Sequence, residues 1–181
     1  SRLQEVLHGK IPWARLLKGD LIHAFGSEFA TFARPRRQYY PDIILPTMQS
    51  RTTKILVLGI DVSASVGETL MKEFVANVMP AALRANKTVV VTFDAVKREE
   101  VHTTQPRKIL KQVKFLTGAH SHTDACSVFE VADKVKPSAI AVLTDGYIDI
   151  PEHPYPNTVW AIPTNGRKQP WGKNYTMDLS W

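Results

Sequence analysis

The stretch Ile55–Ser65, ILVLGIDVSAS, joins a run of apolar residues to three oxygen-bearing side chains at alternate positions. The apolar part is typical of a buried β-strand, and Asp61, Ser63 and Ser65 follow where that strand ends. In an extended turn these side chains converge on one side, and carboxylate and hydroxyl oxygens are the ligands that Mg²⁺, Mn²⁺ and Ca²⁺ prefer. One carboxylate leaves a divalent ion only partly neutralised, so an acidic group of another molecule can complete its ligand shell. The stretch therefore predicts a metal site through which the protein adheres to a partner.

The sequence from residue 54 onward alternates strand patterns with helix patterns. Runs of Val, Ile and Leu without polar alternation are typical of a parallel sheet that is covered on both faces. The predicted fold class is therefore α/β, a doubly wound three-layer sandwich with a mostly parallel sheet. The expected strands are residues 55–61, 87–94, 97–102, 139–144 and 158–162, and the expected helices are 66–84, 108–115 and 123–135.

Ligands of such folds bind outside the carboxyl ends of the strands, where the strand order reverses. Asp61 follows the first strand, and the sequence Leu143-Thr144-Asp145-Gly146 follows a later one. We therefore expect both acidic strand ends at the same edge of the sheet.

Residues 1–53 differ in pattern from the rest of the chain. Apolar residues at helical spacing predict two helices within residues 1 to about 26, and Pro12 suits the first turn of the second helix. Residues 27–53 carry several prolines and little periodicity, which predicts an irregular segment that wraps the main domain. We thus expect an N-terminal helical and irregular extension, 1–53, packing on a main domain, 54–181.

Composition narrows the class of protein. The chain has 181 residues, 44% of them hydrophobic, and a formal net charge of +6. Cys126 is the single cysteine, which excludes an intrachain disulfide and favours a reducing compartment, the cytoplasm. No apolar run approaches the roughly 20 residues that span a bilayer. The chain starts in helical sequence without an initiator Met, which indicates a fragment of a longer protein.

Three pieces of the sequence together resemble the metal-ion-dependent adhesion site (MIDAS) of von Willebrand factor type A (VWA) domains. They are Asp61-Val-Ser63-Ala-Ser65, Thr123 at the start of a helix, and Leu143-Thr144-Asp145-Gly146. A narrower set of residues is similar to a bacterial and phage subfamily that carries a VWA-like domain at the carboxyl end of predicted metallopeptidases. That set comprises Trp13, Arg34-Pro35-Arg36-Arg37, Leu45-Pro46, Thr123-Asp124, residues 144–151, Val159-Trp160 and Pro170-Trp171-Gly172.

The resemblance implies a specific ligand set, cofactor and partner. It makes Asp61, Ser63, Ser65, Thr123 and Asp145 the metal shell, with the aspartates acting through bridging waters. The implied ion is Mg²⁺, with Mn²⁺ or Ca²⁺ as alternatives. Because this subfamily is often encoded beside MoxR-type AAA+ ATPases, such an ATPase is the expected protein partner. The metallopeptidase itself would lie upstream of this chain.

Two other residues and one other metal are also candidates. Asp124 and Asp149 are expected to orient the hydroxyl ligands through hydrogen bonds. His120, His122, Asp124 and Cys126 stand at alternate positions and suit zinc if the segment is extended. If Thr123 starts a helix, the alternation breaks and the histidines are exposed loop residues, which is the interpretation we favour.

Enzymatic activity within this fragment is not expected. The sequence has no Gly-x-Ser-x-Gly elbow, no His-Glu-x-x-His pair and no Walker A loop. The alternative function is a nucleic-acid or phosphate-binding accessory domain that uses the basic tracts, Arg34 to Arg37 and Lys97 to Lys114. The arginines at 34–37 equally suit a structural role, in which they pin an extended segment to its own domain.

Overall fold

The structure is a computed structural model that describes residues 13–26, 29–31, 47–49, 53–63, 66–93, 98–103 and 123–177. For residues 29–31, 47–49, 98–103 and 123 it describes the backbone alone. The first of the two helices expected within residues 1–26 and the helix expected at 108–115 lie outside these ranges, as do Pro12, Ser65 and the arginines at 34–37. The second expected helix is confirmed as Trp13–Ala24.

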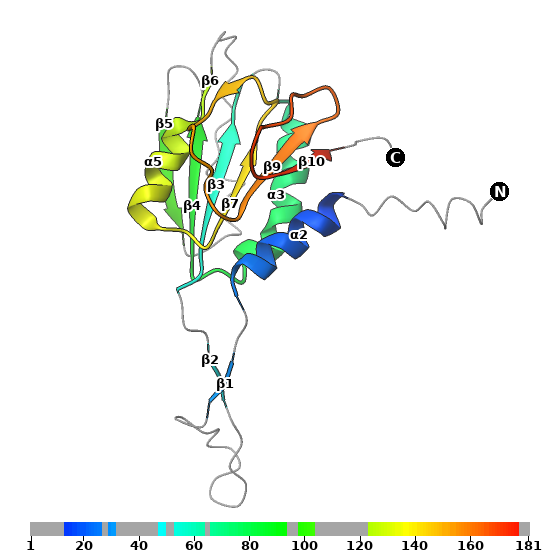
Figure 1. Ribbon diagram of the computed structural model, residues 1–181. Helices are drawn as coiled ribbons and strands as arrows, with labels where there is room; N and C mark the ends of the chain where they lie inside the picture. Colours follow the sequence, from blue (N-terminus) through cyan, green and yellow to red (C-terminus); the bar gives the residue numbers. More distant parts are fainter. Residues whose placement is uncertain are drawn as a thin grey trace, which may run out of the picture.

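A six-stranded sheet forms the middle layer, in the order β10-β9-β7-β3-β4-β5 (Figure 1). Five of the strands run parallel, and β5 is antiparallel to β4 at one edge. The predicted mostly parallel α/β sheet is thus confirmed. The strands are β3 (Ile55–Asp61), β4 (Lys87–Phe93), β5 (Arg98–Thr103), β7 (Ala139–Leu143), β9 (Thr158–Pro163) and β10 (Lys173–Met177).

Helices cover the sheet on both faces, as the continuous apolar strands require. Helices α2 (Trp13–Ala24) and α3 (Glu68–Ala82) lie on one face and α5 (Cys126–Val135) on the other (Figure 1). Successive residues of a strand point to opposite faces, so Leu56 and Leu58 join the core under α2 and α3 whereas Val57 joins the core under α5. The three layers therefore contain two separate apolar cores.

Helix α2, although it precedes the sheet strands by a long segment, is packed into the main core. Leu17 and Leu21 are fully buried in the same cluster as the α3 side chains. Asp20 accepts hydrogen bonds from Lys173 and Tyr175 of β10. The helix is therefore joined to the edge strand of the sheet by polar as well as apolar contacts.

Several elements differ from the sequence predictions. The strand β10 was not expected, and the helix expected from 66 to 84 is Glu68–Ala82. The segment 27–53, expected to be irregular, contains an antiparallel pair, β1 (Phe29–Thr31) with β2 (Thr47–Gln49), which lies below the sheet in Figure 1.

The helix expected from Thr123 begins only at Cys126. Thr123 and Asp124 instead form the short strand β6, which pairs in parallel with β8 (Ile148–Asp149). The prediction was wrong because it used the local sequence alone, whereas this pairing joins residues far apart in the chain.

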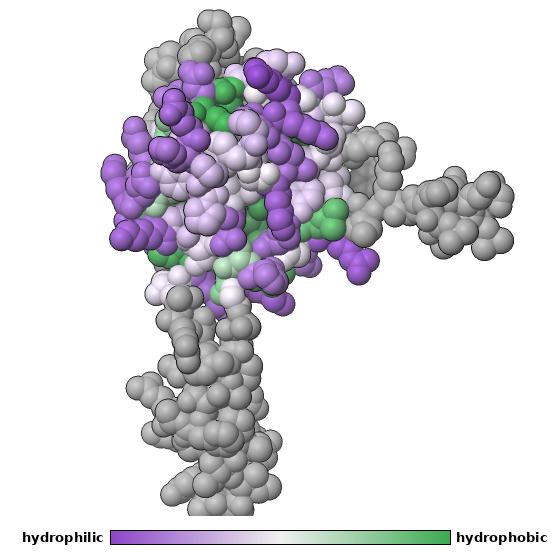
Figure 2. All heavy atoms as spheres, viewed as in Figure 1, coloured by the Kyte–Doolittle hydropathy of each residue, from purple (hydrophilic) through white to green (hydrophobic). Residues whose placement is uncertain are grey.

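The visible surface is mostly polar. Figure 2 shows hydrophilic residues over most of one face, with small hydrophobic patches between them. Among the described residues, the large hydrophobic side chains that are exposed are Leu16, Leu83 and Tyr147. In the same residues we find no helix with the length and apolar character needed to traverse a bilayer.

Candidate metal site at the sheet edge

The candidate site lies where the strand order reverses. β4 lies on one side of β3 and β7 on the other, so the chain leaves the central strand β3 in both directions. Asp61 is the last residue of β3, and Thr144 and Asp145 directly follow β7. The parallel register pairs Ile60 with Leu143, which sets Asp61 beside Thr144. The topology thus brings two distant stretches of sequence together at the position where this class of fold binds ligands.

Asp61 is fully buried and is held by hydrogen bonds to both of its carboxylate oxygens. Its Oδ1 accepts from the Ser63 amide at 2.9 Å, and its Oδ2 accepts from Thr144 Oγ1 at 3.0 Å. Burial raises the pKa of Asp61 above its ordinary value, and the negative charge of Asp145 adds to the shift, although hydrogen bonds from Ser63 and Thr144 oppose it. The carboxylate therefore has a fixed orientation in surroundings that disfavour its charge.

Thr144 is the residue that links the two acidic strand ends. It is fully buried, and its Oγ1 both donates to Asp61 and accepts from the Gly146 amide at 3.0 Å. The sequence pattern pointed to Asp145 and gave Thr144 no role. The available signal was a hydroxyl residue directly after a buried strand that neighbours an acidic strand end.

Asp145 is partly exposed and forms a tight turn. Its Oδ1 accepts from the Tyr147 amide at 3.0 Å, a local hydrogen bond that aspartate commonly makes in turns. Asp145 lines an open cavity of about 420 Å³, together with Leu70, Tyr147, Met177 and the loop after β9. Tyr147 is 65% exposed at this edge. Asp145 thus faces a hollow that a partner can enter.

The other expected ligands are described in part. Ser63 is buried and follows Asp61, in hydrogen-bond contact with it. The backbone of Thr123 pairs with Ile148, just beyond the Asp145 turn, and the adjoining Ala125 amide donates to Asp149 O at 3.2 Å. Asp61, Ser63, Asp145 and the backbone of Thr123 are therefore brought to one end of the sheet. Ser65 and the side chain of Thr123 lie outside the described part.

The described contact of Asp124 is with the start of a helix. Its Oδ1 accepts from the Cys126 amide at 2.8 Å, at the start of α5. Burial raises the pKa of Cys126 to about 11, with the Asp124 carboxylate adding to the shift. Cys126 belongs to the helix, so the alternation expected of a zinc site does not continue through it. Within the described ranges no group of three or more His, Cys, Asp or Glu side chains is placed to hold a metal.

The described donors at this edge suit a hard cation. The carboxylates of Asp61 and Asp145 stand at the ends of adjacent strands, and the hydroxyl of Ser63 lies beside the first. Oxygen donors without nitrogen or sulfur favour Mg²⁺, Mn²⁺ or Ca²⁺ over zinc.

Comparison with known protein families gives one match. The model of the family described as VWA-like domain (DUF2201) matches residues 56–178, which is more than half of the 181-residue chain. The match includes both strand ends that form the candidate site. Searches of curated proteins and of solved structures found no match to the chain.

Proposed function

Since the chain belongs to the VWA-like domain family DUF2201, as its resemblance to VWA domains predicted, we propose that it is a metal-dependent protein-binding module. Asp61, Ser63, Ser65, Thr123 and Asp145 would hold a Mg²⁺ ion, with Mn²⁺ or Ca²⁺ as alternatives. The bound ion supplies an electrophilic centre for a carboxylate of the partner. The observation that carries this proposal is the placement of Asp61 and Asp145 at the ends of the adjacent strands β3 and β7, at the reversal point of the sheet.

The electrostatics of the two aspartates support a cation. A buried carboxylate beside a second negative charge costs free energy, which a divalent ion between or beside them offsets. Thr144 fixes the direction of the Asp61 carboxylate through its hydrogen bond, so little reorganisation is needed when the ion binds. The arrangement thus supplies both the charge and the orientation that an ion site needs.

The surroundings of Asp145 support a protein ligand. The cavity beside it is lined by apolar side chains from separate elements, Leu70 of α3 and Met177 of β10. Tyr147 stands exposed at the same place, and exposed tyrosines are enriched in protein interfaces. A partner whose carboxylate reaches the ion therefore finds apolar and aromatic contacts next to it.

VWA-like domains are in general interaction modules without catalytic activity, and we propose that role for this chain. The proposed partner is a MoxR-type AAA+ ATPase, and the proposed context is the carboxyl end of a metallopeptidase-family protein in the cytoplasm. The alternative, a nucleic-acid or phosphate-binding domain, depends on basic tracts whose side chains lie outside the described residues. It therefore stays a prediction from sequence.

Binding to a purified MoxR-type ATPase by biolayer interferometry tests the proposal. We expect binding in Mg²⁺ that EDTA abolishes and added Mg²⁺ restores, and that Asp61→Ala eliminates. If neither EDTA nor Asp61→Ala changes the affinity for the ATPase, and the affinity falls steeply as the salt concentration rises, adhesion through a metal ion is contradicted. Binding to single-stranded DNA that is unaffected by EDTA and falls steeply with salt would favour the nucleic-acid alternative.

A further inference from the structure

The loop between β9 and β10 donates hydrogen bonds to the turn that contains Asp145. The Arg167 amide donates to the carbonyl oxygen of Asp145 at 2.8 Å. The side-chain amide of Gln169, Nε2, donates to the carbonyl oxygen of Gly146 at 2.9 Å. Two consecutive peptide groups of the turn therefore each receive a hydrogen bond from this loop.

The backbone of the turn and the backbone of the loop are in close contact. Gly146 has φ +87°, and a Cβ there would lie 1.8 Å from the carbonyl oxygen of Arg167. On the opposite side, a Cβ on Gly166 would lie 2.6 Å from the carbonyl oxygen of Asp145. Only glycine permits this approach from either side. The loop and the turn therefore fit together as one unit.

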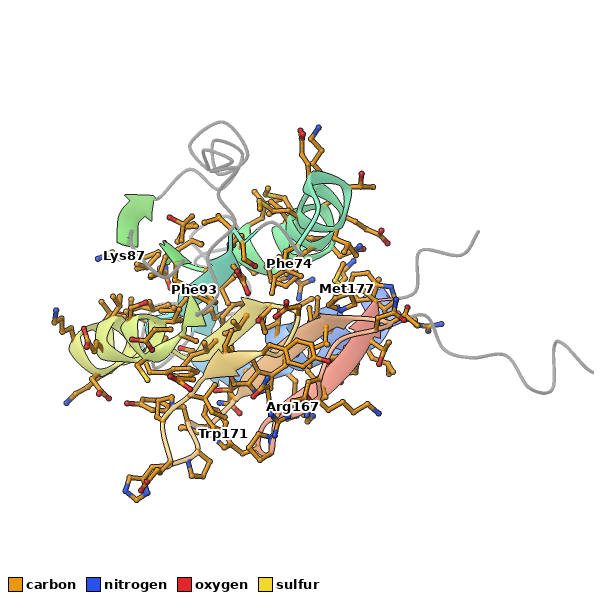
Figure 3. The ribbon with its side chains drawn as sticks, turned by 90° about the horizontal axis from the view of Figure 1, so that it is seen from above. Phe74, Lys87, Phe93, Arg167, Trp171 and Met177 are labelled. Atoms are coloured by element: carbon orange, nitrogen blue, oxygen red, sulfur yellow. The ribbon has the colours of Figure 1, made fainter. Side chains whose placement is uncertain are left out.

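Gln169 is itself fixed to the sheet. The backbone amide of Gln169 donates to Asn174 Oδ1 at 2.8 Å, and Asn174 Nδ2 donates to the backbone carbonyl oxygen of Gln169 at 3.0 Å. Asn174 belongs to β10, where it pairs in register with Trp160 of β9. Figure 3 shows the labelled Arg167 and Trp171 of this loop on the β9 and β10 side of the molecule. The sheet edge thus supports the loop, and the loop supports the turn.

A continuous series of buried hydrogen bonds runs from Gln169 to Asp61. Gln169, which is only 8% exposed, donates to Gly146 O; Gly146 N donates to Thr144 Oγ1; and Thr144 Oγ1 donates to Asp61 Oδ2. Buried polar networks of this kind hold each member in place, because an unpaired member is costly. The series therefore connects Gln169 to both acidic strand ends.

We propose that Gln169 is a positioning residue for the metal site, holding the Asp145–Gly146 turn and, through Thr144, the Asp61 carboxylate in the geometry that binds the ion. The proposal rests on the metal-dependent function above. Gln169 does not contact the ion. Residues that orient metal ligands typically change metal affinity by about 10–100-fold when replaced.

The test compares Gln169→Met, which keeps the length of the side chain and removes its amide, with Lys168→Met at the exposed neighbouring position. Two quantities are measured on folded protein: hydrogen exchange of the Gly146 and Tyr147 amides in EDTA, and the Mg²⁺ dissociation constant by calorimetry. We expect Gln169→Met to speed exchange at both amides and to weaken Mg²⁺ binding by about 10-fold or more. Lys168→Met should change neither quantity.

Unchanged exchange in Gln169→Met overturns the proposal whether or not the protein binds Mg²⁺. Faster exchange with an unchanged dissociation constant also overturns it, because Gln169 is then structural only. Absence of Mg²⁺ binding by the parent protein instead refutes the proposed function. If Gln169→Met does not fold, Asn174→Asp serves in its place, since it keeps the Oδ1 acceptor and loses the Nδ2 donor. We expect it to change both quantities in the same direction, and no change in either overturns the proposal.

Discussion

Replacing Thr144 by Val tests how strongly the buried hydroxyl holds the two strand ends together. The substitution keeps the shape of the side chain and removes the donor to Asp61 Oδ2 and the acceptor of the Gly146 amide. A hydrogen bond to a charged group contributes about 1.5–3 kcal/mol, and a buried amide left without a partner costs about 1–3 kcal/mol. Both hydrogen bonds involve the same atom, Thr144 Oγ1, and neighbouring groups adjust once it is removed, so the two costs do not add in full. We therefore expect the free energy of unfolding to fall by about 2–4 kcal/mol.

Urea unfolding in EDTA, followed by circular dichroism, measures this loss without any contribution from metal. Thr158→Val is the matched control, because Thr158 is also buried, at 3% exposure, and its Oγ1 donates to a neutral carbonyl, Tyr155 O, at 2.9 Å. That variant should lose about 0.5–1.5 kcal/mol. Equal losses in the two variants, or a loss below about 1 kcal/mol for Thr144→Val at an unchanged m-value, would refute the assigned role of this hydroxyl.

Two further outcomes are expected for other buried or paired groups. Thr88 is 1% exposed, and its Oγ1 has no hydrogen-bond partner among the described residues. In urea unfolding, Thr88→Val should therefore leave the free energy of unfolding unchanged or raise it by about 1 kcal/mol. A clear loss of stability would show that the hydroxyl has a partner. Burial acts to raise the pKa of Asp20, but hydrogen bonds from Lys173 and Tyr175 outweigh it and the pKa lies below its ordinary value. The stability that ionised Asp20 contributes is therefore present above its ordinary pKa and is lost as the pH falls through the lowered value. Asp20→Asn should cost about 1–2 kcal/mol at pH 7 and progressively less below about pH 4, whereas a pH-independent difference in thermal unfolding would contradict the pairing.

The central elements of the fold were predictable because their sequences satisfy simple rules. β3 and β7 are continuous apolar runs, as a sheet buried on both faces requires, and the structure buries every residue of β7. β10 was missed because Lys173–Met177 is a polar edge strand with a single buried residue. Such a strand is recognisable only from its neighbour β9, which the local sequence does not reveal.

The candidate site was predictable to the extent that its residues follow apolar strands. Asp61 and Asp145 were identified that way, and the structure places them at the ends of adjacent strands. The roles of Thr144 and Gln169 were missed for different reasons. Thr144 acts through register with β3, and Gln169 lies in the segment Gly166–Pro170, whose composition predicts only a loop. Both depend on contacts between distant segments. The metal-ligand roles of all five residues, Asp61, Ser63, Ser65, Thr123 and Asp145, stay predictions.

Calorimetric titration of Mg²⁺ into metal-free protein is the most direct measurement, with Asp145→Asn as the test variant and Asp133→Asn as a control of equal charge. Asn at 145 keeps the Oδ1 that accepts from the Tyr147 amide, so the turn should be retained while the charge is lost. Asp133 is exposed on α5 and bonds to Tyr155, away from the strand ends. We expect one ion per chain in the parent protein and in Asp133→Asn, and severely weakened binding in Asp145→Asn. Absence of binding in the parent, or equal affinity in all three proteins, would contradict a metal site at this edge of the sheet.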